Sequence, residues 1–155
     1  MTPEQMAALM DRAYVQMRPW SADDIASTVS ARHTLLLTHD HGFLIAQTVA
    51  DEGEILAIAT DPTQQRQGVA SSLLSELIRQ AVQQGITRIF LDVAAQNQPA
   101  RAFYAAKGFA QVGTRKAYYT LRDGSKDDAL LLSLAIAQGQ DAPAPTSQGS
   151  GAKSG

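Results

Sequence analysis

The stretch QRQGVA, from Gln65 to Ala70, combines residue types that suit an anion-binding turn at the start of a helix. The first N–H groups of a helix lack partners within the helix, and the helix dipole places partial positive charge there. Gly68 would let a ligand approach the backbone closely, and Arg66 adds positive charge. The stretch is neither a Walker loop nor a Gly-x-Gly-x-x-Gly dinucleotide turn. By itself it fits either a diphosphate cradle or an ordinary helix start.

Carboxylates and a tyrosine further along the chain could transfer protons. Asp92 lies in the otherwise apolar strand pattern IFLDVAA, and Glu54 stands near the start of another strand pattern. Each could be a general base or only a strand-end carboxylate that reaches water. Tyr104 has the helical spacing of a core residue, yet its hydroxyl could act as an acid. Asn97 stands where a helix N-cap is expected.

The composition excludes several classes of chemistry. The chain has 155 residues, a net charge of −2 and no cysteine. The charge gives no electrostatic footprint for nucleic acid or an anionic membrane, so we expect neither as a partner. The absence of cysteine excludes thiolate catalysis, disulfides and cysteine-ligated zinc. His39 and His41 flank Asp40, but we expect no metal site because further ligands are not evident.

The sequence also shows no pattern typical of a targeting signal or a membrane span. The N-terminal residues have charges among their apolar positions and lack the apolar core of a signal peptide. No apolar run approaches the roughly 20 residues that span a bilayer. We therefore expect a cytoplasmic protein, and we expect a monomer.

Hydrophobic periodicity predicts the elements that must position these residues. Thr2 and Gln5 predict a capping box for a first helix, and Ser21 predicts the N-cap of a second. The expected strands are 33–38, 42–50, 53–60, 87–93, 109–121 and 128–136, with further helices at 69–84 and 98–107. This order predicts an α/β fold with a mixed, twisted sheet of about six to seven strands and helices on both faces. We expect one domain over 1–137 and a disordered tail of Ala, Pro, Gln, Ser and Gly over 138–155.

The stretch from Ile55 to Phe109 resembles the GCN5-related N-acetyltransferase (GNAT) family. QRQGVA matches the family signature Gln/Arg-x-x-Gly-x-Gly/Ala, and LDVAAQNQPARAFYAAKGF matches the strand and the Asn-led helix that follow. The resemblance implies the GNAT fold and acetyl-CoA as co-substrate, without a metal. It also implies that the turn binds the pyrophosphate of coenzyme A.

The resemblance assigns roles to individual residues. Asp92 becomes the proton acceptor, with Glu54 as a second base or orienting group, and Tyr104 the proton donor to the coenzyme A thiolate. The family usually has Glu where this chain has Asp92, so a bridging water or Glu54 could serve instead. The implied cofactor-binding residues are Ile58, Ala59, Thr60, Gln65, Arg66, Gln67, Gly68, Val69, Ala70, Ser71 and Asn97.

The hairpin RKAYYTLRDGSKDDALLLSL narrows the resemblance to family members that acetylate the N-terminal alanine of a small-subunit ribosomal protein. This implies a protein N-terminus as partner. Tyr118 and Tyr119 would line the groove that binds it, and Asp127 or Asp128 would lie near its amine. Without cysteine, direct attack in a ternary complex is the simplest scheme. An α-amine is roughly a quarter neutral at cytosolic pH and a lysine only about 0.1%. A lysine or small-amine acceptor, and a non-catalytic coenzyme A-binding scaffold, are the alternatives.

Overall fold

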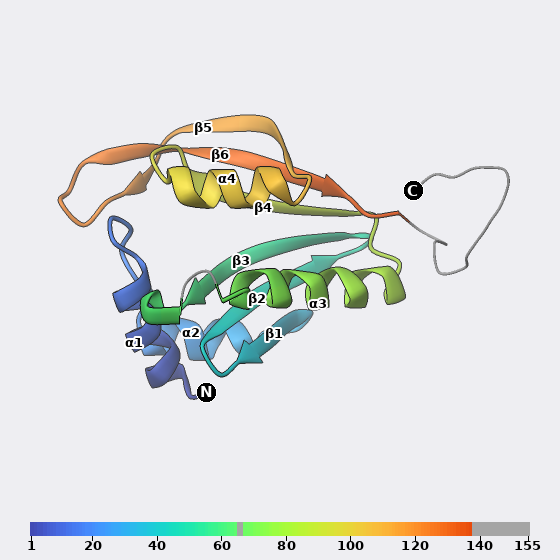
Figure 1. Ribbon diagram of the computed structural model, residues 1–155, viewed down its shortest axis with the longest axis horizontal. Coiled ribbons are helices and arrows are strands. Elements are labelled where there is room, and N and C mark those ends of the chain that lie inside the picture. Colours follow the sequence, from blue (N-terminus) through green and yellow to red (C-terminus); the bar gives the residue numbers. More distant parts are fainter. Residues whose placement is uncertain (65–66, 138–155) are drawn as a thin grey trace, which may run out of the picture.

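The computed structural model describes residues 1–64 and 67–137 and has a mixed α/β architecture (Figure 1). The order of helices and strands matches the predicted order, and the sheet has six strands. The elements are α1 (Pro3–Ala13), α2 (Ala22–Val29), β1 (Thr34–His39), β2 (Gly42–Val49), β3 (Glu52–Thr60), a short 3-10 helix (Pro62–Gln64), α3 (Val69–Gln83), β4 (Arg88–Ala94), α4 (Gln98–Ala106), β5 (Ala110–Thr120) and β6 (Lys126–Ala135). The tail predicted for 138–155 lies outside the described residues.

The sheet is mixed, as the sequence predicts. Its strands follow the order β1-β2-β3-β4-β6-β5. The β3–β4 pair is parallel and is connected through α3, whereas the other neighbouring pairs are antiparallel. A parallel pair needs such a crossover, because the chain must return to the same end of the sheet.

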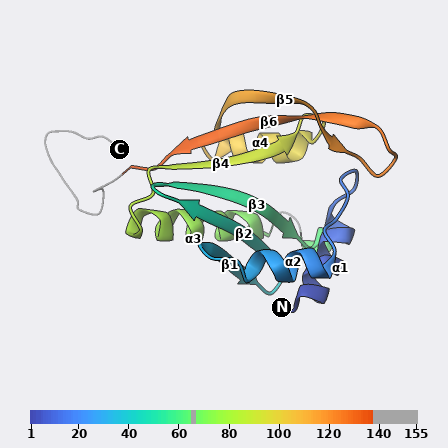
Figure 2. The same ribbon diagram turned by 180° about the vertical axis from the view of Figure 1, so that it is seen from behind.

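Helices cover both faces of the sheet, and each face has its own core. Figures 1 and 2 show α3 and α4 on one face and α1 and α2 on the other. Leu73, Leu77 and Tyr104 belong to the core on the α3/α4 face. Met10 and Ile25 belong to the core on the α1/α2 face. Both faces therefore bury apolar side chains, which the near-continuous apolar strand patterns require.

Polar side chains begin three of the helices where the sequence predicts. Thr2 Oγ1 accepts the N–H of Gln5, whose side chain accepts the N–H of Thr2, completing the capping box. Ser21 Oγ accepts the N–H of Asp24 at the start of α2. Asn97 Oδ1 accepts the N–H of Ala100 at the start of α4. These caps satisfy backbone donors that would otherwise have no partner.

A β-bulge in β3 changes which way its residues face. Ile45 pairs with Ala57 and Ala46 with Ile55, so Leu56 is an extra residue on β3. Ile55 then lies in the α3/α4 core and Ala57 in the α1/α2 core, although regular alternation would place both on one face. A bulge bends its strand and increases its twist. The bend comes just where β3 leaves β4.

In the described parts of the chain, no helix is both long and apolar enough to cross a membrane.

Candidate active site

The two central parallel strands pair over only part of their length. The ladder runs from Glu52–Arg88 to Ile55–Leu91, and both strands then continue without pairing to each other. Figure 1 shows β3 and β4 diverging from their paired ends. Beyond this ladder, the edge of β3 around Ile58, Ala59 and Thr60 is not paired with β4, although the carbonyl of Ile58 accepts a hydrogen bond from Tyr14. A ligand could pair with this edge as an added strand would. This geometry fits the predicted role of these three residues.

The start of α3 fits the predicted anion site. Gly68 is the N-cap residue, with φ of 78°, in the left-handed region that favours glycine. Because glycine has no side chain, it leaves the first N–H groups of α3 uncapped by their N-cap residue, in contrast to α1, α2 and α4. A Cβ at Gly68 would meet no atom of residues 1–64 or 67–137 within 4 Å, so these residues leave the space beside it open.

Apart from Gly68, the structure describes four of the six predicted cofactor-binding residues in the turn before α3 and in its first helical turn. Val69 is buried in the α3/α4 core, so only its backbone could bind an anion. Ala70 and Ser71 are half-buried in the first turn of α3, and Gln67 is exposed just before it. The predicted contributions of Gln65 and Arg66 lie outside the described residues.

The two candidate bases lie on neighbouring strands and face the same side of the sheet. Leu91 and Val93 belong to the α3/α4 core, so Asp92 between them faces the α1/α2 side. Glu54 precedes Ile55, which also belongs to the α3/α4 core, and so faces that same side. Burial raises the pKa of Glu54, the Asp92 carboxylate raises it further, and Arg115 partly opposes both effects.

An arginine that the sequence analysis did not single out contacts Asp92. Arg115 Nε lies 3.2 Å from Asp92 Oδ1, and the Asp92 side chain is only 13% exposed. The Arg115 guanidinium also lies over the ring of Tyr118, 5.6 Å from its centre. Asp92 is thus held as one partner of an ion pair. Its spacing from Arg115 along the chain gave no signal of this contact.

Tyr104 is 5% exposed, and its ring packs edge-to-face against Phe103 and Phe109. Burial raises its pKa above the ordinary value, and Tyr14 and Tyr119 add to the shift. A tyrosine with a raised pKa stays protonated at neutral pH and can donate its proton. The core position that the spacing of Tyr104 suggests is therefore compatible with its predicted role as an acid.

Tyr14, at the end of α1, is a second tyrosine that the sequence analysis missed. Its hydroxyl donates to the carbonyl of Ile58 over 3.4 Å, on the part of β3 that has left β4. Burial raises the pKa of Tyr14 to about 12. Tyr14 in turn raises the pKa of both Tyr104 and Tyr119.

The tyrosine pair predicted to wall the acceptor lies at the end of β5. Tyr118 is exposed and Tyr119 half-buried, with ring centres 5.1 Å apart. The pKa of Tyr119 is raised, first by burial and then by the Asp92 carboxylate. Tyr118 also packs against Arg115, the ion-pair partner of Asp92, which links the tyrosine pair to the candidate base.

Asp127 has partners of its own within the fold. It is 7% exposed, and its two carboxylate oxygens accept the backbone N–H groups of Gln96 and Asp128, at 3.0 and 2.9 Å. These bonds tie the start of β6 to the loop that leads into α4. The carboxylate therefore has a structural role, and its contact with a substrate stays a prediction.

The two loops beside the tyrosines are bound to each other by Arg122. Its guanidinium donates to the carbonyls of Tyr14, Asp11 and Met17 over 2.7–3.0 Å. Its Nη1 also donates to the Asp11 carboxylate at 3.1 Å. The connection between α1 and α2 is thereby fixed to the β5–β6 turn, a contact between residues more than 100 positions apart that no local pattern reveals.

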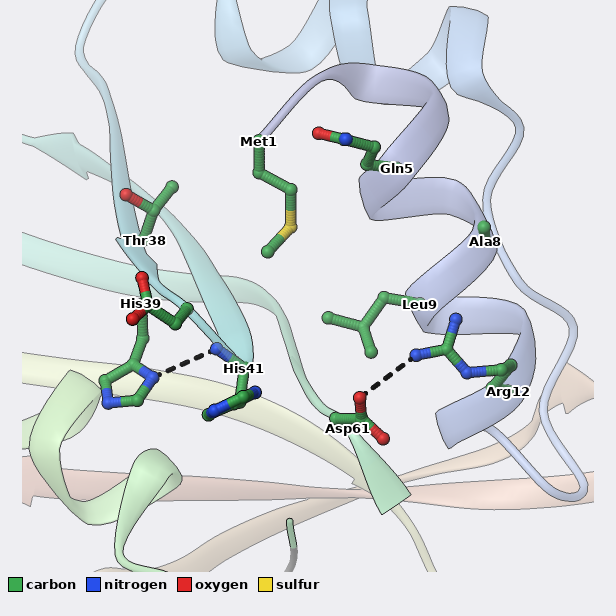
Figure 3. A pocket seen from close by; sticks show the side chains of 10 residues that line it. Met1, Gln5, Ala8, Leu9, Arg12, Thr38, His39, His41 and Asp61 are labelled. Atoms are coloured by element: carbon green, nitrogen blue, oxygen red, sulfur yellow. Dashed lines mark hydrogen bonds and ion pairs between the residues drawn. The ribbon is translucent and has the colours of Figure 1, made fainter. Parts of the chain in front are cut away.

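A pocket of about 520 Å³ lies apart from these residues, between α1 and the β1–β2 turn (Figure 3). Arg12 lies 3.3 Å from Asp61 in it, and Asp61 also accepts hydrogen bonds from the backbone and side chain of Thr63. His39 Nδ1 accepts the backbone N–H of His41. Within residues 1–64 and 67–137, no group of three or more potential metal-ligating side chains could hold a metal ion.

Comparisons with known proteins agree with this geometry. The model of the Acetyltransferase (GNAT) family matches residues 8–109. A ribosomal protein bS18-alanine N-acetyltransferase from Haemophilus ducreyi is 35% identical over 120 residues, which cover 75% of this chain and 83% of that protein. Its counterpart from Escherichia coli strain K12 is 36% identical over 122 residues, 76% of this chain and 82% of that protein.

A solved structure has a similar fold over most of its length. The crystal structure of the ribosomal-protein-S18-alanine N-acetyltransferase from Escherichia coli superposes with a TM-score of 0.77 at 34% identity, covering 87% of this chain and 88% of that chain. The resemblance predicted from the cofactor turn, the Asn-led helix and the last hairpin is thus confirmed. The chain belongs to the GNAT acetyltransferase family and is an acetyl-CoA-dependent N-acetyltransferase.

Proposed function

We propose that this enzyme acetylates the α-amino group of the N-terminal alanine of a small-subunit ribosomal protein, in the cytoplasm and as a monomer. The observation that carries the proposal is the identity of 35–36% to enzymes named for that reaction, over more than four fifths of their length. We expect no nucleic acid and no membrane to take part.

The residues at the opening between β3 and β4 fit acetyl-CoA. The uncapped start of α3 suits the pyrophosphate, and the edge of β3 around Ile58, Ala59 and Thr60, which is not paired with β4, suits the pantetheine amides. Asn97 would add a side-chain contact while it caps α4. Bound acetyl-CoA supplies a thioester whose acyl carbon is open to direct attack by an amine.

The chain's own groups then handle protons. Asp92 or Glu54, directly or through a water, accepts the proton of the amine, and Tyr104 donates to the departing thiolate. Because the chain has no cysteine, a cysteine-bound acyl group cannot form, and direct attack with both substrates held together is the simpler scheme. Catalysis then depends largely on positioning, which the fixed tyrosines and the Asp92–Arg115 ion pair provide.

The acceptor follows from how much base catalysis the site offers. An α-amine, roughly a quarter neutral at cytosolic pH, needs only modest help from a base, whereas a lysine needs much more. Asp92 is one methylene shorter than Glu and is paired with Arg115, so it suits the less demanding amine.

Matched peptides test the proposal. A peptide that begins with alanine, and the same peptide with a blocked N-terminus, are each incubated with the enzyme and acetyl-CoA, and thiol release is measured. We expect release only with the free N-terminus, and initial-rate plots that intersect as a ternary complex requires. Equal release with the blocked peptide would overturn the acceptor, and parallel plots would overturn direct attack.

A further inference from the structure

The last hairpin contains a wide bulge beside the candidate base. Arg115 pairs with Ala129 and Tyr119 with Asp127, so three residues of β5 face one residue of β6, Asp128. In the middle of the bulge, Ala117 has φ of 49°. A non-glycine residue in this left-handed region is strained, and it persists only where its surroundings hold it there.

The Asp128 carboxylate holds the bulge. Its Oδ1 accepts the backbone N–H of Ala117 at 2.8 Å, and its Oδ2 lies 3.7 Å from Lys116 Nζ. The backbone of Asp128 is itself fixed on both sides. Its N–H donates to Asp127 Oδ1 at 2.9 Å, and its carbonyl accepts the N–H of Ala95, also at 2.9 Å. The strained residue is thus bound to a strand and to the loop that leads into α4.

The bulge decides where Tyr119 stands. With regular pairing beyond Arg115, Tyr119 would lie opposite Ser125 instead of Asp127. That position is two residues, or about 6.6 Å, further from Asp92 along the hairpin. Because the bulge adds two residues, it keeps Arg115 and Tyr119 on the same face of the sheet as Asp92. Bulges are over-represented beside active sites.

We propose that Asp128 is a positioning residue of the acceptor site, whose carboxylate holds the β5 bulge that places Tyr118 and Tyr119 beside Asp92. This rests on the proposed acceptor groove. It differs from the prediction that a carboxylate here contacts the amine directly, because Asp128 Oδ1 is already bonded to Ala117 N–H. The role requires a hydrogen-bond acceptor at residue 128 and does not require a negative charge.

Two substitutions separate these roles. Asp128→Asn keeps an acceptor for Ala117 N–H and loses the charge, whereas Asp128→Ala loses both. We expect Asp128→Ala to raise KM for the alanine peptide about tenfold with acetyl-CoA affinity unchanged, and Asp128→Asn to stay within about twofold of the wild type. Lys116→Ala is the matched control and should change nothing, since its ion pair is exposed. Equal loss in Asp128→Asn and Asp128→Ala would overturn positioning in favour of a charge contact.

Hydrogen exchange tests the proposal without an acceptor. We expect the Ala117 amide to be protected in the wild type and in Asp128→Asn, and to exchange faster in Asp128→Ala. Loss of protection of the Ala117 amide in Asp128→Asn would contradict the proposed bond. This result is informative even if Asp128→Ala does not fold. If the wild type acetylates another amine, the proposed acceptor is wrong. The exchange of the Ala117 amide then still supports or refutes the role of Asp128, because it is measured without an acceptor.

Discussion

Opposite charges beside Glu54 should move its pKa in opposite directions when each is removed. The Asp92 carboxylate raises the pKa of Glu54, and Arg115 lowers it. Asp92→Asn should therefore lower the pKa of Glu54, and Arg115→Gln should raise it. If Glu54 is the base that accepts the amine proton, the acid limb of the pH–rate profile moves with it, to lower pH in Asp92→Asn and to higher pH in Arg115→Gln.

The size of the effect follows from the register of the strands. Glu54 pairs with Phe90, two residues before Asp92 on the neighbouring strand. Strand spacing and rise per residue then place the two backbone positions roughly 8 Å apart, and both side chains extend to the same side of the sheet. Coulomb's law over that distance gives about 0.5–2 kcal/mol for an effective dielectric constant between 80 and 20. Glu54 is only half-buried, so we expect the lower half of that range.

Carbon-detected NMR titration of the glutamate carboxyl groups measures the shift directly, and Glu54→Gln identifies the Glu54 signal. Rate profiles are compared with one acceptor peptide, so that the titration of its amine is common to all variants. Shifts of the same sign in Asp92→Asn and Arg115→Gln, or no shift in either, would refute the electrostatic coupling. A kcat that falls strongly in Asp92→Asn but little in Glu54→Gln would assign the base to Asp92.

Three further predictions concern the cofactor, the acid and the tail. Gly68→Glu should prevent acetyl-CoA binding by placing a carboxylate at the start of α3, and unchanged affinity in calorimetry would contradict the cofactor site. Tyr104→Phe should lower kcat about 10²–10⁴-fold with little change in acetyl-CoA affinity, whereas a kcat within about twofold, when chemistry is rate-limiting, would return Tyr104 to a packing role. Truncation after Ala137 should change neither melting temperature nor activity, because the sequence beyond it lacks large apolar residues, and a loss of either would mean that the tail docks.

Local signals predicted the elements well because they act over a few residues. Thr2 with Gln5, Ser21 and Asn97 mark helix starts through hydrogen bonds to nearby backbone groups. Gly85, at φ of 75°, marks the end of α3 because glycine readily adopts the left-handed conformation that ends a helix. The alternation of apolar residues likewise predicts strands, and the chain order then limits the sheet to a mixed topology.

The contacts that shape the candidate site depend on tertiary structure. Arg115 and Arg122 look like ordinary exposed strand and turn residues in the sequence, and their partners lie 23 and more than 100 residues away. The bulge at Leu56 inserts one residue within a continuous apolar run, so no break in the pattern reveals it. The sequence predicts that Asp127 contacts substrate. It does not reveal the hydrogen bonds that the Asp127 carboxylate accepts from backbone N–H groups, because these are visible only in the fold.

Mass spectrometry of one product peptide tests the central claim most directly. The peptide begins with alanine, carries an internal lysine and is incubated with the enzyme and acetyl-CoA, and fragmentation then locates the acetyl group. We predict a single acetyl group on the α-amine of alanine and none on the lysine. An acetyl group found mainly on the lysine would contradict N-terminal specificity while leaving the acetyltransferase activity in place.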